Sequence, residues 1–208
     1  MVLLVYGGVM KEVIFATSNE SKLKRFKSGL EKKGIKLLSL RDEGVSINVN
    51  ENGNTAIENA SLKAYAGYVA TKKVTIGMDD SLYLCGVPDN LQPGLFVRRV
   101  NGRVLSDKEM IEHYISLVNQ YGTDGKLPAK WVYGMALVDI NGNIHTYTWE
   151  KGGFYLTNKQ SDIINPGYPL NSISKYEKIN KYFTEITLED EIPDIDESDV
   201  IEFIASHV

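Results

Sequence analysis

Short apolar runs alternate with helical periodicity over the first eighty residues of the chain. Glu12–Ala16 is apolar and β-branched, which predicts a buried strand. Leu23, Phe26 and Leu30 then recur at helical spacing, and Gly34 closes that segment. The same criteria predict two further strands, Ile35–Leu40 and Val74–Met78, and a second helix, Thr55–Thr71.

Beyond residue 100 the pattern indicates one long helix and a hairpin. Ser106–Tyr121 carries apolar residues on one side at helical spacing, which predicts a third helix. Trp131–Ile140 and Ile144–Trp149 flank Asn141-Gly142, a strong short signal for a β-hairpin. We also expect a sheet extension over Gly152–Leu156 and a short helix near Asp199–Ala205. This order of elements predicts an α/β fold with a mixed β-sheet and flanking helices.

The length and the cysteine content set simple limits. A chain of 208 residues suits one α/β domain or two closely fused lobes. Its single cysteine, Cys85, permits no internal disulfide, which fits a reducing cytoplasm. Residues 1–9 are apolar, but they are few and lack a basic leader, so we interpret them as an N-terminal extension and not as a signal peptide or membrane span. We expect residues 10–208 to form one two-lobed domain in the cytoplasm.

Charge is unevenly distributed along the chain. Thr187–Val208 holds eight acidic residues and no lysine or arginine, and we treat it as an acidic C-terminal tail. Seven basic residues fall between Lys22 and Lys36. A basic surface of this kind could attract nucleotides or nucleic acid, although a solvated helix face is the simpler interpretation. The acidic tail could also place a helix on this basic part of the chain.

A first candidate for chemistry joins the first strand to the first helix. The segment reads Ala16-Thr17-Ser18-Asn19-Glu20-Ser21-Lys22. The N-terminus of a helix offers unpaired N–H groups and a positive dipole end, so it binds phosphate well. Ser18 and Asn19 can add hydrogen bonds, and Lys22 can pair with a phosphate as a point charge. The structural alternative is an ordinary helix cap beside a solvated lysine.

Two further segments carry charged side chains at informative positions. Asn59 and Lys63 lie four residues apart in the second predicted helix and therefore share one side, and Glu58 lies next to its apolar stripe. Asp79-Asp80 follows an apolar strand, where open α/β sheets bind ligands. Carboxylates are the oxygen ligands that Mg²⁺ prefers, and they can also orient a water molecule. Routine surface charges and a polar turn are the structural alternatives.

Taken together, four motifs occur in order with a specific spacing. They are ATSNxxK (16–22), NGNTAIENASLKA (52–64), DDS (79–81) and PGLFVRR (93–99). In these motifs the chain resembles the Ham1 family, also called the inosine triphosphate or non-canonical purine triphosphate pyrophosphatase family. The likeness extends over most of residues 11–172. It implies an elongated mixed α/β fold with two lobes around a central cleft, and a homodimer.

The resemblance also implies roles for individual residues. The first loop of such enzymes holds the triphosphate, which here implies Thr17, Ser18, Asn19 and Lys22. Glu58 and Asp80 would bind Mg²⁺, with Asp80 as general base and with Asp79 and Lys22 also in catalytic roles. Further substrate contacts are implied for Ser81, Gly167 and Tyr168, and from their positions in the sequence we also expect substrate contacts for Asn59, Lys63 and Arg99.

The chain departs from the family pattern mainly where the base would be read. Arg25, Leu82 and Pro169 stand where the family has glutamate, glycine and aspartate, and the late Ser-His-Arg signature has no counterpart. Residues that could form a replacement base pocket are Trp131, Tyr133, Trp149, Phe154, Tyr168 and Asn171. Aromatic side chains can stack on a base, but we favour core packing for most of them.

These observations predict a Mg²⁺-dependent enzyme that cuts a nucleoside triphosphate, ribose or deoxyribose, into a monophosphate and pyrophosphate. We expect no membrane partner and no nucleic-acid partner. Two alternatives stay open. The chain could be a nucleotide-binding regulator of the same fold, or a nucleic-acid binder that uses the surface between Lys22 and Lys36.

Overall fold

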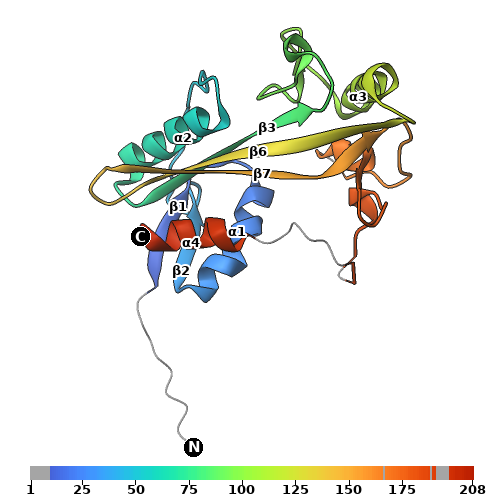
Figure 1. Cartoon of the computed structure of the whole chain (residues 1–208). Helices are drawn as coiled ribbons and strands as arrows, with labels where there is room; N and C mark the ends of the chain where they lie inside the picture. Colours follow the sequence, from blue (N-terminus) through green and yellow to red (C-terminus); the bar gives the residue numbers. More distant parts are fainter. Residues whose placement is uncertain (1–9, 166, 188, 191–196) are drawn as a thin grey trace, which may run out of the picture. The chain divides into compact units, whose positions relative to one another are not determined.

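The computed structural model describes residues 10–165, 167–187, 189–190 and 197–208 (Figure 1). Its strands are β1 (Lys11–Phe15), β2 (Ile35–Ser39), β3 (Thr75–Leu84), β4 (Arg99–Val100), β5 (Arg103–Val104), β6 (Lys126–Val138), β7 (Ile144–Thr157) and β8 (Ser174–Tyr176). Its α-helices are α1 (Glu20–Lys32), α2 (Ala56–Thr71), α3 (Asp107–Tyr121) and α4 (Ser198–Ser206). The expected extension over residues 1–9 lies outside the described residues, as does part of the acidic tail.

The chain divides into two compact units. The first unit contains the described residues up to Asp79, Tyr133–Thr148 and the C-terminal helix α4. The second unit contains Asp80–Val132 and the described residues from Trp149 to Asp190. The long strands β3, β6 and β7 contribute residues to both units.

The main sheet is mixed, as the order of predicted elements indicated. In the described part of the chain it has six strands in the order β2-β1-β3-β6-β7-β8, and β4 pairs with β5 in a separate ribbon. β1 runs parallel to both β2 and β3, whereas β7 and β8 are antiparallel. The predicted α/β class and the flanking helices are therefore confirmed.

β3 is longer than its sequence pattern predicted. We expected a strand that ends at Met78 and runs directly into Asp79-Asp80-Ser81, with a polar turn as the structural alternative. That expectation is wrong, because the strand continues to Leu84 and holds both aspartates in its interior. Leu82 and Leu84 are almost completely buried, so apolar packing resumes beyond the acidic pair and keeps the strand extended.

α2 packs unusually close to the sheet within the first unit. A Cβ atom on Gly77 of β3 would lie 2.2 Å from the backbone oxygen of Ala60, and one on Gly134 of β6 would lie 2.5 Å from the backbone nitrogen of Ile57. Only glycine leaves enough space for the helix at these two points. The small buried residues Ala60 and Ala64 line the same face of α2. This close approach determines which side chains of α2 reach β3.

The C-terminal helix α4 docks on α1, as the charge distribution suggested (Figure 1). The guanidinium of Arg25 donates two hydrogen bonds to the Glu197 carboxylate, at 2.6 and 2.9 Å. Ile201 fills the space above Gly29, where a Cβ atom would overlap its side chain. An exposed ion pair joins Lys33 to Glu202 at 2.5 Å. Part of the basic surface between Lys22 and Lys36 is therefore neutralised within the chain itself.

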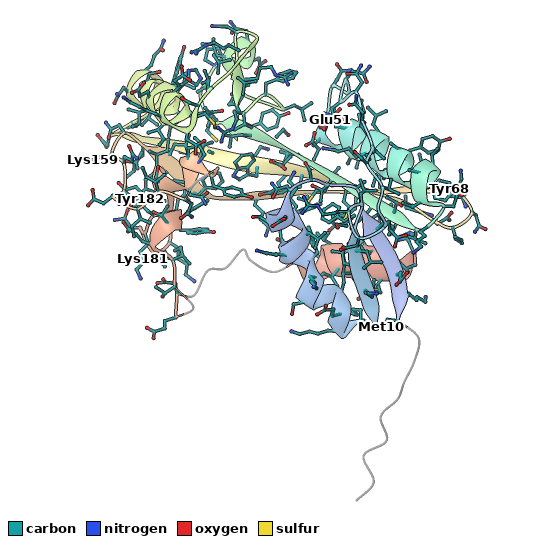
Figure 2. All side chains as sticks on the ribbon, turned by 180° about the vertical axis from the view of Figure 1, so that it is seen from behind. Met10, Glu51, Tyr68, Lys159, Lys181 and Tyr182 are labelled. Carbon is teal, nitrogen blue, oxygen red and sulfur yellow. The ribbon has the colours of Figure 1, made fainter. Side chains whose placement is uncertain are left out.

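The second unit has its own apolar core around α3. Ser106 and Glu109 form a reciprocal capping box at the start of this helix. Its buried residues are Met110, Ile111, Tyr114, Leu117 and Val118, which is the apolar side that the sequence predicted. In the same unit, the Tyr182 hydroxyl donates to the Lys159 carbonyl at 2.9 Å (Figure 2).

None of the helices in the described ranges is long and apolar enough to cross a membrane.

Candidate functional site

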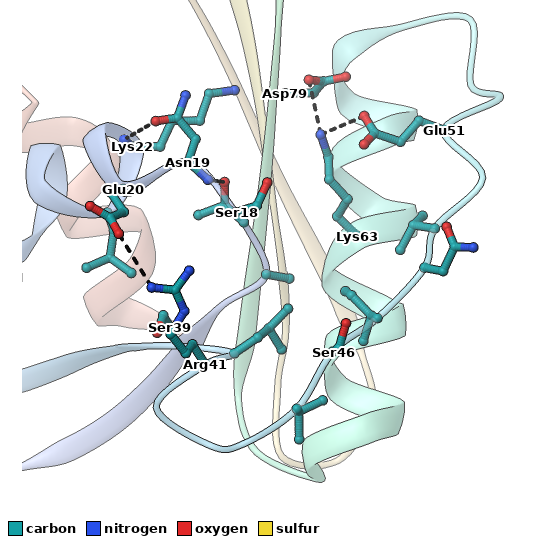
Figure 3. A pocket seen from close by; sticks show the side chains of 18 of the residues that line it. Ser18, Asn19, Glu20, Lys22, Ser39, Arg41, Ser46, Glu51, Lys63 and Asp79 are labelled. Carbon is teal, nitrogen blue, oxygen red and sulfur yellow. Dashed lines mark hydrogen bonds and ion pairs between the residues drawn. The ribbon is translucent and has the colours of Figure 1, made fainter. Parts of the chain in front are cut away.

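A pocket of about 820 Å³ lies within the first unit (Figure 3). Four segments of the chain form its walls, namely the loop between β1 and α1 with the start of α1, the loop that follows β2, α2 and β3. The charged residues that line it are Glu20, Lys22, Arg41, Glu51, Lys63 and Asp79. Lys22 and Asp79, which the sequence analysis assigned to one site, therefore do line the same pocket.

The loop between β1 and α1 is ordered by its own polar side chains. The Asn19 Oδ1 atom accepts the backbone N–H groups of Ser21 at 2.9 Å and Lys22 at 3.4 Å, so Asn19 caps α1. The Thr17 hydroxyl oxygen accepts the N–H of Asn19 at 3.1 Å. All four predicted phosphate-binding residues of this loop line the pocket, namely Thr17, Ser18, Asn19 and Lys22. The side-chain Oδ1 atom of Asn19, however, already accepts these two hydrogen bonds from the first turn of α1.

The start of α2 holds the loop that precedes it. The N–H of Gly53 donates to Asn59 Oδ1 at 2.9 Å, and the N–H of Asn54 donates to Glu58 Oε2 at 2.7 Å. A Cβ atom on Gly53 would lie 2.7 Å from Asn59 Oδ1, so this close approach needs glycine. Glu58 does not line the pocket. Its carboxylate binds the loop, and the loop presents a different acid, Glu51.

Lys63 connects the acidic residues of the pocket. Its ammonium nitrogen lies 2.9 Å from Glu51 Oε2 and 3.1 Å from Asp79 Oδ1 (Figure 3). Asn59 donates from Nδ2 to the other Asp79 oxygen, Oδ2, at 3.0 Å. The two side chains expected to share one side of α2 therefore hold the same carboxylate. Glu51 was missed by sequence reasoning, because it lies in an irregular loop where no periodicity indicates its direction.

Asp80 and Ser81 do not line this pocket. Asp79 lies on the face of β3 that meets α2, where Asn59 holds its carboxylate. Asp80 is the next residue of the strand, and its role as general base stays a prediction. The Ser81 side chain is buried, and its hydroxyl donates to the Val132 carbonyl of the neighbouring strand at 3.3 Å. That bond serves the sheet, so a substrate contact for Ser81 stays a prediction.

The remaining predicted substrate residues lie in the second unit. The guanidinium of Arg99 lies above the ring of Phe96, 5.5 Å from its centroid. The N–H of Gly167 donates to Asp107 Oδ2 at 3.0 Å, and this bond lowers the pKa of the Asp107 carboxyl together with the neighbouring Arg98. The Tyr168 side chain is exposed. The substrate roles of Arg99, Gly167 and Tyr168 stay predictions.

The aromatic residues considered for a base pocket have different surroundings. Phe154 is buried against Phe183 at a centroid distance of 5.3 Å, and Trp131 packs against the same core. Core packing is confirmed for these two. Tyr133, in the first unit, lies under the guanidinium of Arg25 at 4.7 Å. Arg25 therefore connects α1, the tail and an aromatic side chain of β6.

The comparison with known proteins agrees with this geometry. A profile of the Ham1 family matches residues 13–163, a range that includes every wall of the pocket. The chain belongs to the Ham1 family. That membership rests on nearly three quarters of the sequence and includes residues of both compact units.

Curated relatives of this Ham1 chain carry the name dITP/XTP pyrophosphatase. The relative from Bacillus subtilis is 38% identical over 110 residues, which are 52% of this chain and 54% of the relative. This chain thus spans about half the length of that relative, and of the similar one from Bacillus licheniformis. The relative from Clostridium tetani is 31% identical over 174 residues, 80% of this chain and 82% of the relative.

Solved structures show the same fold. The Staphylococcus aureus Ham1 protein superposes with a TM-score of 0.67 at 22% identity, covering 86% of this chain and 88% of that one. A HAM1 protein from Coxiella burnetii gives a TM-score of 0.68 at 22% identity, with 86% and 89% covered. At this identity the likeness establishes the fold alone.

Mg²⁺ is the metal that the Ham1 resemblance implies. Within the described ranges, no group of three or more histidine, cysteine, aspartate or glutamate side chains is arranged to hold a metal ion. Mg²⁺ often takes only one or two carboxylates and fills its remaining positions with phosphate oxygens and water. Glu51 and Asp79, both on the pocket wall and both within ion-pair distance of Lys63, provide such hard-oxygen donors. The donor set therefore fits Mg²⁺ in the presence of a nucleotide.

Proposed function

We propose that this Ham1 chain is a Mg²⁺-dependent nucleoside triphosphate pyrophosphatase, which converts a triphosphate into a monophosphate and pyrophosphate. The observation that carries the proposal is the pocket of the first unit, in which the loop with Lys22 faces Lys63 and Asp79. The names of the relatives support non-canonical purine triphosphates as the substrate class.

Binding of the triphosphate would use the cationic side chains of the pocket. Lys22 stands one turn into α1, beside the positive end of the helix dipole. Lys63 is only 13% exposed at its side chain, and it now neutralises two carboxylates. A phosphate oxygen would compete with the more exposed of these, Glu51, for the ammonium. That exchange would release the Glu51 carboxylate toward the metal.

The proposed metal donors are Glu51 and Asp79, which both line the pocket, in place of the expected pair Glu58 and Asp80. Glu51 replaces Glu58 because it lines the pocket, whereas the Glu58 carboxylate binds the N–H of Asn54. When bound, Mg²⁺ would offset phosphate charge and make the phosphorus more open to attack. Lys63 and Asn59 already fix the Asp79 carboxylate, so it would be held in position for the metal.

The proposed chemical step uses Asp80 as general base. A water oxygen forms a bond to the alpha phosphorus while its proton passes to the Asp80 carboxylate. The bond between the alpha phosphorus and the oxygen that bridges to the beta phosphate breaks, and pyrophosphate leaves with that oxygen. Lys22 and Lys63 stabilise the charge that develops on the phosphate oxygens.

A panel of triphosphates tests this proposal. Inosine, deoxyinosine, xanthosine and the standard four nucleotides are incubated with Mg²⁺, and the products are separated. The proposal expects monophosphate and pyrophosphate in equal amounts, with loss of turnover in Asp80→Asn although the variant stays folded. Binding of triphosphate without pyrophosphate release would instead support a nucleotide-binding regulator. Diphosphate and inorganic phosphate as products would contradict the proposed bond cleavage.

Three further expectations accompany the proposal. The two compact units are candidates for the two lobes of the family, and the elongated outline with its central cleft remains a prediction. A homodimer and a cytoplasmic location are proposed from the resemblance. Light scattering of the purified chain tests the dimer directly.

A further inference from the structure

The pocket contains a third cation that the family motifs do not include. Arg41 follows β2, whose last residue, Ser39, pairs with Phe15 at the end of β1. Because the two strands are parallel, both chain segments leave the sheet at the same edge. Arg41 therefore starts beside the loop that carries Lys22, and its side chain lies on that side of the pocket (Figure 3).

A tight turn fixes the backbone at Arg41. The Arg41 carbonyl accepts the N–H of Gly44 at 3.0 Å, and Gly44 has a positive φ of 66° that suits glycine. Asp42 accepts both the N–H and the hydroxyl of Ser39 at 2.8 Å, so this neighbouring acid is engaged by the turn. The backbone thus presents Arg41 from an ordered position.

Among the described residues, the Arg41 guanidinium makes an ion pair that is easily exchanged, besides a minor electrostatic interaction with the neighbouring Asp42. Its Nη1 atom lies 3.7 Å from Glu20 Oε1, and the two side chains are 88% and 73% exposed. Exposed pairs at this distance contribute little to stability. A phosphate group accepts two parallel hydrogen bonds from a guanidinium, which is a stronger and more specific interaction. Arg41 can therefore move from Glu20 to a ligand at low cost.

The two ends of the pocket differ in a way that orients a triphosphate. Asp79, Lys63 and Glu51 gather at one end, whereas Arg41 and Glu20 lie at the other, near Lys22 (Figure 3). The alpha phosphorus must lie near the general base, which is the residue after Asp79. The beta and gamma phosphates then extend toward Lys22 and Arg41.

We propose that Arg41 binds the two phosphates that leave as pyrophosphate, and that it makes the site selective for a triphosphate over a monophosphate. The proposal rests on the proposed function for the direction of the triphosphate. Its test uses equilibrium binding and does not require turnover.

Calorimetric titration with inorganic pyrophosphate and MgCl₂ provides this test, with deoxyinosine monophosphate as the second ligand. Arg41→Ala should weaken pyrophosphate binding by about tenfold or more, and monophosphate binding by less than about twofold. Arg41→Lys should be intermediate, because an ammonium lacks the planar fork. Arg103→Ala is the matched control, an arginine of the second unit that is also exposed and ion-paired.

Two results would overturn the inference. One is pyrophosphate binding by Arg41→Ala that equals that of the unaltered chain, and the other is an equal loss for pyrophosphate and monophosphate, which indicates a general structural effect. If the unaltered chain binds pyrophosphate but releases none from any triphosphate, the proposed function fails while the role of Arg41 in binding is still measured.

Discussion

The Lys63 ammonium lies 3.1 Å from Asp79 Oδ1, and this ion pair connects α2 to the interior of β3. The pair exists because α2 approaches the sheet closely enough for a lysine and an asparagine, one turn apart, to reach one carboxylate. Gly77, two residues before Asp79 on the same face of the strand, makes that approach possible. The site geometry therefore depends on a residue that has no side chain.

Replacing Gly77 should test this dependence. In Gly77→Ala the new Cβ atom would lie 2.2 Å from the Ala60 oxygen and 2.6 Å from the Ala64 nitrogen, so α2 must move away. We expect a loss of about 1–3 kcal/mol in the free energy of unfolding, as overpacking typically causes. Gly152→Ala is the control, because a Cβ atom there meets nothing within 4 Å. Equal stability of the two variants would show that α2 does not depend on the space at Gly77.

Much of the first unit could be predicted from local sequence. The capping residues Asn19 and Thr55 begin helices where the pattern placed them. The opposite charges of the two segments suggested that a helix of the tail could dock on the basic part of the chain, and α4 does dock on α1. Phe154 lies in the apolar core, as we favoured for the aromatic residues considered as a base pocket.

The remainder depended on contacts between residues far apart in the sequence. The end of β3 was predicted too early, because two aspartates look like a turn until their partner helix is known. β8 has only three residues and carries no readable pattern. Glu58 was the expected metal donor because the family resemblance implied it, but in the fold its carboxylate binds the N–H of Asn54 and Glu51 lines the pocket.

The assignment of Glu51 leads to a prediction about metal dependence. Glu51→Gln should raise the Mg²⁺ concentration needed for half-maximal pyrophosphate release by about tenfold or more, because one anionic donor is lost. Glu58→Gln should shift it much less. Glu150→Gln, whose carboxylate pairs with Lys130 in the second unit, provides a control outside the site. A larger shift for Glu58→Gln than for Glu51→Gln would return the role to Glu58.

The tail contact should contribute measurably to stability. Glu197 is only 9% exposed at its side chain and receives two hydrogen bonds from Arg25, whereas Glu202 is 65% exposed and pairs with Lys33. We expect Glu197→Gln to lower the free energy of unfolding by about 1–2 kcal/mol, and Glu202→Gln to change it by less than about 0.5 kcal/mol. Urea denaturation measures both. Identical effects would mean that the burial of Glu197 has no energetic consequence.

The capping box of α3 predicts a dependence of stability on pH. The Ser106 N–H, followed by Arg103, lowers the pKa of Glu109 from its ordinary 4.5 to about 2. A carboxyl whose pKa is lower in the folded state stabilises the protein at pH values above its pKa in the unfolded state. That contribution disappears as the pH falls from 4.5 toward 2. The free energy of unfolding of Glu109→Gln should therefore depend less on pH across this window than that of the unaltered chain. If it falls equally with pH in both proteins, the low pKa of Glu109 is not the cause of the decline.

The central claim is that the loop with Lys22 and the cluster around Lys63 hold one triphosphate in one pocket. Binding of a non-hydrolysable α,β-methylene analogue of deoxyinosine triphosphate tests it directly, with Lys22→Met, Lys63→Met and, as control, the ion-paired Lys130→Met of the second unit. We expect each pocket variant to bind about tenfold or more weakly and the control to bind unchanged. Unchanged affinity in both pocket variants would contradict the account.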